Sequence, residues 1–171
     1  MAEVFLRRLT RWQAEQQRED VATVYAACHD QDRQGFLERF ERHVQERDFD
    51  MVAASSATGL VGCLYGYRAA PDTPHFAALR DVLPPADAGA AASGRLFLIV
   101  GLMVLPERRR RGTATRMREL LLSRHRTDVV VTTLAAPGDG SAHEVLRAWS
   151  CTKLGEFAAP PREAWLHPGG A

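Results

Sequence analysis

The chain has 171 residues, of which 46% are hydrophobic, and this length and composition predict one packed domain spanning residues 1–171. Its 22 basic and 21 acidic residues give a formal net charge of +1, which argues against a general nucleic-acid or membrane-surface binder. No apolar stretch reaches the roughly 18 residues that span a bilayer, and arginines interrupt the N-terminal stretch where a signal peptide would need apolar residues. We therefore expect a cytoplasmic protein with no membrane partner.

The N-terminal half predicts a strand, two helices and a hairpin. Apolar residues recur at helical spacing in two stretches, with Val21, Val24 and Cys28 in the first and Phe36, Phe40 and Val44 in the second. A tight turn at Thr58–Gly59 separates two apolar runs of strand character. The expected elements are a strand at 4–9, helices at 12–28 and 34–47, and strands at 51–55 and 60–67.

The composition changes in residues 68–95, which are rich in Ala, Pro, Gly and Asp and contain one helical fragment at 75–83. We expect an insertion loop or lid here. Further along the chain, β-branched residues predict an interior strand at 128–134. A short helix at 141–149, a strand at 153–157, and a C-terminal strand and tail within 158–171 complete the expected mixed α/β arrangement.

The most informative stretch joins an apolar strand at 96–104 to a helix that begins near Ala114. Between them lie Pro106, four consecutive arginines at 108–111, and Gly112. The first N–H groups of a helix lack internal partners and carry the positive end of its dipole, so they can hold an anion. Gly112 lets the backbone approach that anion closely. The stretch predicts a phosphate site, although a solvated basic patch or a nucleic-acid tract stays open as the alternative.

Within this stretch, the pattern Val104-x-Pro106-x-x-Arg109-x-x-Gly112-x-Ala114 resembles the coenzyme A pyrophosphate loop of the GCN5-related N-acetyltransferase (GNAT) family. The Leu-x-Val-x-Pro strand end directly before the loop strengthens the match. The lysine of the P-loop and the Gly-x-Gly-x-x-Gly of dinucleotide folds are absent, so rival phosphate sites fit poorly. The resemblance covers residues 51–157 and is specific only at 96–114.

The resemblance implies an α/β fold with a mixed, mostly antiparallel twisted sheet flanked by helices on both faces. It also implies acetyl-CoA as co-substrate and transfer of the acetyl group to an amine of a small molecule or peptide. The backbone of the central strand would pair with the pantetheine arm and donate an N–H to the thioester oxygen. The cofactor-binding residues implied are Leu102, Met103, Val104, Arg109, Arg110, Arg111, Gly112, Thr113, Ala114, Asp139 and Ala142.

Two residues depart from the family pattern at the positions that commonly carry the general base and the general acid. The base is usually a glutamate directly before Leu-x-Val, where this chain has Gly101, and the acid is usually a tyrosine on the last helix, where it has Leu146. His143 and Tyr65 are weak catalytic candidates. His29 and Asp30, with Tyr65 again, are weak substrate-binding candidates, and each also fits a packing or solvated role.

The sequence thus predicts an N-acetyltransferase that works by direct attack of the amine in a ternary complex. One positioned acid or base contributes roughly 10²–10⁴-fold, whereas proximity supplies on the order of 7–11 kcal/mol, so the departures need not abolish transfer. The alternative is a catalytically silent CoA-binding module. No paired His, Cys or Asp spacing predicts a metal site. Homodimers are common in the resembling family, and the sequence leaves that question open.

Overall fold

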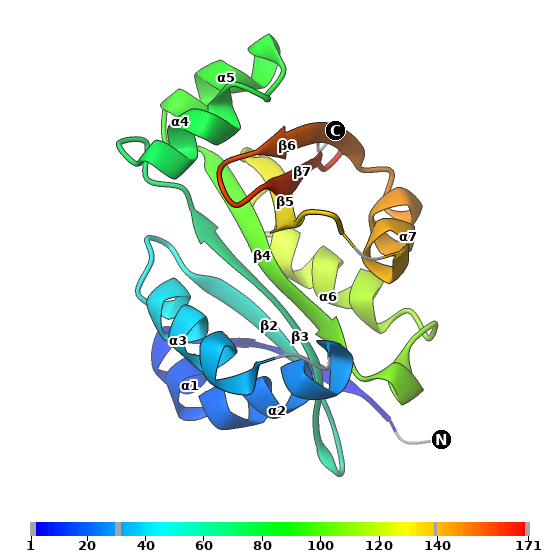
Figure 1. Ribbon diagram of the computed structural model, residues 1–171. Helices are drawn as coiled ribbons and strands as arrows, with labels where there is room; N and C mark the ends of the chain where they lie inside the picture. Colours follow the sequence, from blue (N-terminus) through cyan, green and yellow to red (C-terminus); the bar gives the residue numbers. More distant parts are fainter. Residues whose placement is uncertain (1–2, 30–31, 139, 170–171) are drawn as a thin grey trace. The chain divides into compact units, whose positions relative to one another are not determined.

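The computed structural model describes residues 3–29, 32–138 and 140–169, which form an α/β fold (Figure 1). The strands are β1 (Phe5–Leu9), β2 (Asp50–Ser56), β3 (Gly59–Arg68), β4 (Leu96–Val104), β5 (Val129–Ala135), β6 (Thr152–Phe157) and β7 (Arg162–Leu166). The helices are α1 (Arg11–Gln16), α2 (Arg18–His29), α3 (Arg33–Val44), α4 (Pro74–Arg80), α5 (Pro85–Ala92), α6 (Thr113–Leu122) and α7 (Gly140–Ala148), with a 3₁₀ turn at Pro106–Arg108.

The seven strands form one sheet in the order β1-β2-β3-β4-β5-β7-β6. Strands β4 and β5 are parallel, while β1–β2, β2–β3, β5–β7 and β6–β7 are antiparallel. This confirms the expected mixed, mostly antiparallel sheet. The chain divides into two compact units, one comprising residues 1–67 and 101–124 and the other residues 68–100 and 125–171.

The first unit carries helices on both faces of its strands. Met51 on β2 pairs with Tyr65 on β3, and the Tyr65 ring meets Phe40 of α3 edge-on at a centroid distance of 5.2 Å. Successive strand residues point to opposite faces, so Asp50 lies on the other side. There it binds Arg8, which also reaches a carbonyl of α6. Helix α3 therefore covers one face and α6 the other.

The second unit is built around the N-terminal half of β4. Leu96 to Ile99 run parallel to Val129 to Thr132 of β5, and β7 lies between β5 and β6. The last strand of the chain is thus inserted into the sheet rather than added at its edge. Asp128, directly before β5, accepts hydrogen bonds from Arg68 and contacts His125, which stacks on Phe97 with ring centroids 3.8 Å apart.

Most expected elements lie within a few residues of their predicted bounds, but the N-terminal helix differs. The single helix expected at 12–28 is two helices that break at Gln17. The first is fixed by a capping box, in which the Thr10 hydroxyl accepts from Gln13 N at 3.1 Å and Gln13 Oε1 accepts from Thr10 N at 2.9 Å.

The region expected to be an insertion loop or lid, residues 68–95, contains the helices α4 and α5. Its predicted helical fragment at 75–83 corresponds to α4, which begins after an N-cap hydroxyl from Thr73 and a first-turn proline, Pro74. Phe76 and Leu79 of this helix are buried. None of the helices in the described residues combines the length and apolar character needed to cross a membrane.

Candidate functional site

The candidate site begins where β4 ends in the first unit. The chain leaves the strand through Leu105 and the 3₁₀ turn, and Arg109 is extended. Arg110 and Gly112 then both adopt left-handed conformations, with φ values of 61° and 78°. Gly112 is the N-cap of α6, and a Cβ added there would meet no protein atom within 4 Å. The expected strand, arginine-rich turn, glycine and helix are therefore all present.

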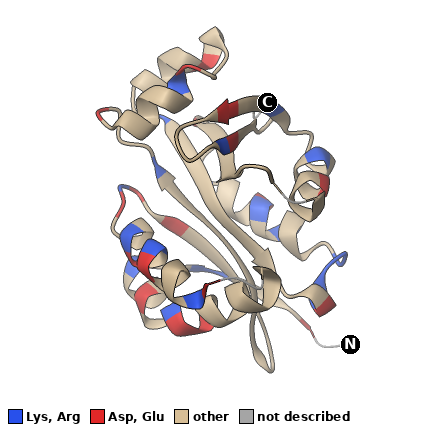
Figure 2. Cartoon of the chain, in the orientation of Figure 1, with Lys and Arg blue, Asp and Glu red and all other residues tan. Residues whose placement is uncertain are grey.

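The N-terminus of α6 has the properties of an anion site. Gly112 has no side chain to accept hydrogen bonds from the first-turn N–H groups, and the first turn contains no acidic residue. The helix is ten residues long, and its dipole favours a negative charge at this end. Figure 2 shows basic residues along the preceding loop and on the helix. The predicted residues from Arg110 to Gly112 are exposed, whereas Thr113 is buried and anchors the start of the helix.

Arg109 has a structural role that its position in the motif does not reveal. Its Nε donates to the carbonyl oxygen of Val104 at 2.9 Å, which ties the loop back to the end of β4. The same carbonyl accepts from the thiol of Cys28 at 3.3 Å. Burial raises the pKa of Cys28, with Arg109 acting in the opposite direction. Sequence reasoning missed Cys28 because no local pattern connects the end of α2 to the end of β4.

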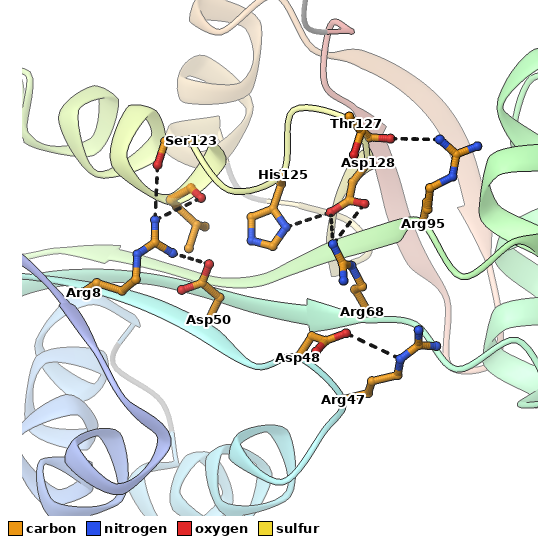
Figure 3. A network of polar contacts seen from close by, with 11 residues as sticks. Arg8, Arg47, Asp48, Asp50, Arg68, Arg95, Ser123, His125, Thr127 and Asp128 are labelled. Atoms are coloured by element: carbon orange, nitrogen blue, oxygen red, sulfur yellow. Dashed lines mark hydrogen bonds and ion pairs between the residues drawn. The ribbon is translucent and has the colours of Figure 1, made fainter.

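The other end of α6 is held by Arg8, which the sequence analysis also missed (Figure 3). Arg8 Nη2 donates to the Leu120 carbonyl at 2.5 Å and to Ser123 Oγ at 3.4 Å, while Nη1 binds the carboxylate of Asp50. A cation at a helix C-terminus satisfies the last carbonyls and complements the dipole. Helix α6, whose N-terminus is the candidate anion site, is thereby anchored to both β1 and β2.

The weak catalytic candidate Tyr65 lies on β3 in the first unit. It is 2% exposed, and its ring fills the space beside Gly101 of β4. Burial raises the pKa of the Tyr65 phenol well above its usual value. The phenol oxygen lies 3.4 Å from Nδ1 of His43 on α3, a residue that the sequence analysis did not select. The substrate-binding candidate His29 is half-buried at the end of α2, with its ring 4.7 Å from that of Tyr25.

The other catalytic candidate, His143, lies on α7 in the second unit. Its Nε2 donates to Oε1 of Glu163 at 2.7 Å, and Glu163 also accepts from Gly138 N at 2.8 Å and Trp165 Nε1 at 3.0 Å. Burial opposes ionisation of Glu163, but these hydrogen bonds prevail and lower its pKa to about 2. His143 therefore helps to satisfy a buried carboxylate.

The structure describes some, but not all, of the remaining predicted site residues. Asp30 and Asp139 lie outside the described residues. Leu102 and Ala142 are half-buried, Met103 is buried, and Val104 is nearly so. Leu146, at the usual tyrosine position, is 2% exposed and packs in the core of the second unit. Within the described residues, the structure thus brings the loop residues together in the first unit and places the α7 residues in the second.

No family model matches the sequence, and no curated protein matches it at the level of sequence. Solved structures match its fold. PH1933 from Pyrococcus horikoshii is 10% identical, with a TM-score of 0.71 and coverage of 99% of this chain and 100% of that one. NAA60 from Arabidopsis thaliana in complex with acetyl-CoA is 13% identical, with a TM-score of 0.65 and coverage of 96% and 98%.

A third similar structure is the aminoglycoside N-acetyltransferase AAC(6')-Iy in complex with CoA. It is 12% identical, with a TM-score of 0.59 and coverage of 86% of this chain and 87% of that one. At these identities the likeness concerns the fold. The strand order, the mixed sheet and these matches lead to one conclusion: the chain has the fold of the GCN5-related N-acetyltransferases.

Proposed function

We propose that the protein is an acetyl-CoA-dependent N-acetyltransferase that acts on an amine of a small molecule or peptide. The observation that carries this proposal is the glycine-capped N-terminus of α6, which follows an arginine-rich loop at the end of β4. A pyrophosphate suits the backbone N–H groups and the dipole at this helix N-terminus, and the positive charge of the arginines in the loop. The fold likeness to proteins solved with CoA and acetyl-CoA supports the same ligand.

In this proposal the loop holds the pyrophosphate mainly through backbone N–H groups at the start of α6. Arg109 braces the loop against Val104, which leaves Arg110 and Arg111 as the side chains that reach outer phosphates. The backbone of Leu102 to Val104 orients the pantetheine arm and donates to the thioester oxygen. Ala142 of α7 and Asp139, which lies outside the described residues, are further contacts proposed from the sequence.

The chemical step is direct transfer in a ternary complex. The neutral amine nitrogen attacks the thioester carbonyl carbon, the C–N bond forms, and the C–S bond breaks with its electron pair going to sulfur. The amine loses one proton and the thiolate gains one, so the products are an amide and free CoA. Holding the two reactants in place lowers the activation barrier by on the order of 7–11 kcal/mol, because their translational and rotational entropy is already lost on binding.

A second candidate function is a catalytically silent CoA-binding module. Gly101 has no side chain and Leu146 has no proton to transfer, so the two positions that commonly carry the base and the acid in the resembling family are chemically inert. Such a module would keep the anion site at Gly112 and lose turnover.

The test combines binding with turnover. Thermal unfolding is measured with and without acetyl-CoA, and thiol release is then followed over a panel of small amines and peptides. Acetyl-CoA binding with amine-dependent thiol release supports the enzyme. Binding without release from any amine favours the silent module. No binding contradicts both.

A further inference from the structure

The absence of a side chain at Gly101 has a structural cause inside the first unit. A Cβ at this position would overlap the aromatic ring of Tyr65, whose Cζ would lie 2.5 Å away. The ring comes from the neighbouring strand β3 and is almost fully buried. Tyr65 therefore occupies the volume into which a residue-101 side chain would project. Its phenol brings a polar atom to this part of the β4 face, directly before Leu102.

The position of the Tyr65 ring is fixed by aromatic neighbours. Phe40 meets it edge-on at 5.2 Å, and Phe49 lies tilted at 5.8 Å. Close-packed interiors leave such a ring little freedom to move. Burial raises the pKa of its phenol, so the group stays neutral at physiological pH. A neutral phenol oxygen can both donate and accept a hydrogen bond.

That phenol oxygen faces His43, the penultimate residue of α3. The distance from Tyr65 Oη to His43 Nδ1 is 3.4 Å, and the His43 ring lies between those of Tyr65 and Tyr67, at 5.9 and 5.5 Å. His43 is half-buried. When Nδ1–H donates to the phenol oxygen, the lone pair of the neutral imidazole is at Nε2.

We propose that His43, oriented by Tyr65, is the general base that accepts the proton of the acceptor amine. The inference rests on the proposed acetyltransferase function and names a residue for its proton transfer. As the amine attacks the thioester, its proton passes to Nε2, directly or through one water, and the C–S electron pair leaves with sulfur. The imidazolium then returns its proton to solvent, from which the thiolate is protonated. His43 is a catalytic residue in this scheme, and Tyr65 is a positioning residue.

Besides His43, the titratable and charged groups that act on the Tyr65 phenol are two further phenols, a thiol and a guanidinium. They include Tyr67 beside His43, and Arg39, one turn earlier on α3, which acts on the Tyr65 phenol. The others acting on that phenol are Cys63 on β3 and Tyr25 on α2. Among these side chains, a histidine is the one suited to accept a proton near neutral pH.

The experiment compares wild type with His43→Gln, which keeps a hydrogen-bonding side chain but cannot serve as a base near neutral pH. Arg42→Gln, at the exposed neighbouring position on α3, is the matched control. Acetyl-CoA binding and the urea midpoint are measured first, followed by kcat/KM against pH. We expect His43→Gln to bind acetyl-CoA normally and to lose roughly 10²–10⁴-fold in kcat/KM at pH 7. In wild type, kcat/KM should rise with pH as the base loses its proton, and this rise should be absent in His43→Gln.

A second variant, Tyr65→Phe, keeps the ring against Gly101 and removes only the phenol oxygen. It should lower kcat more than it raises KM and shift the same limb of the pH profile. If wild type turns over and His43→Gln keeps both its rate and its pH limb, this inference is wrong and the acetyltransferase proposal stands. If wild type releases no thiol with any amine, both are wrong.

Discussion

Replacing Gly101 by alanine should destabilise the protein, and the cost should depend on Tyr65. The added methyl would lie 2.5 Å from Tyr65 Cζ, whereas carbon atoms in contact prefer about 3.5–4.0 Å. Cε1 of the ring would lie closer still to the added methyl, so the ring must retreat by more than about 1 Å, and Phe40 and Phe49 pack against it. Overpacking of this kind costs about 1–3 kcal/mol, from which the lower chain entropy of alanine recovers about 0.4–1 kcal/mol.

A double-mutant cycle tests this reasoning. Tyr65→Leu removes the ring atoms that the methyl would meet, so Gly101→Ala should become neutral or slightly stabilising in that background. Urea unfolding should then give a coupling free energy of about 1–3 kcal/mol in favour of the double variant. Gly89→Ala on α5 is the control: a Cβ there meets nothing within 4 Å, so it should stabilise by about 0.5–1 kcal/mol. If the changes in unfolding free energy of Gly101→Ala and Tyr65→Leu add up to that of the double variant within about 0.5 kcal/mol, the steric argument is wrong.

Two further predictions concern the loop and the second unit. Gly112→Val places a β-branched side chain at φ 78° in front of the α6 N-terminus, so the rise in Tm with acetyl-CoA should disappear. An undiminished rise would show that acetyl-CoA does not bind at this loop. Glu163 has a folded pKa of about 2, below its ordinary 4.5, so it stabilises the fold by roughly 3 kcal/mol above pH 4.5 and loses this as the pH falls towards 2. The stability gap between wild type and Glu163→Gln should narrow over that range, and a constant gap would contradict the pKa.

The sequence predicted the backbone elements of the candidate loop, which are local in the chain. The apolar strand, Pro106 and Gly112 act on backbone conformation within a few residues, so their order alone specified a strand, a turn and a helix start. The structure bears this out in β4, the 3₁₀ turn and α6. The capping box at Thr10 and Gln13 is an equally local signal for the start of the first helix, although the sequence analysis did not use it.

What the sequence did not predict depends on contacts between distant segments. The Tyr65 ring excludes a side chain at Gly101, Cys28 and Arg109 share the Val104 carbonyl, and Arg8 caps α6. Each joins residues that are separated along the chain and close only in the folded sheet. Similarly, the insertion of β7 between β5 and β6 is set by strand pairing and not by any local motif.

The most direct test of the central claim is thermal unfolding with and without acetyl-CoA, with a short DNA duplex as the parallel control. Ligand at about 100 times its Kd adds roughly 2.7 kcal/mol, and a domain of this size shifts by about 2–4 °C per kcal/mol. We expect a rise in Tm of about 5–10 °C with acetyl-CoA and none with DNA. No rise with acetyl-CoA, together with a salt-sensitive rise with DNA, would show that the four arginines bind nucleic acid and that the loop is not a coenzyme A site.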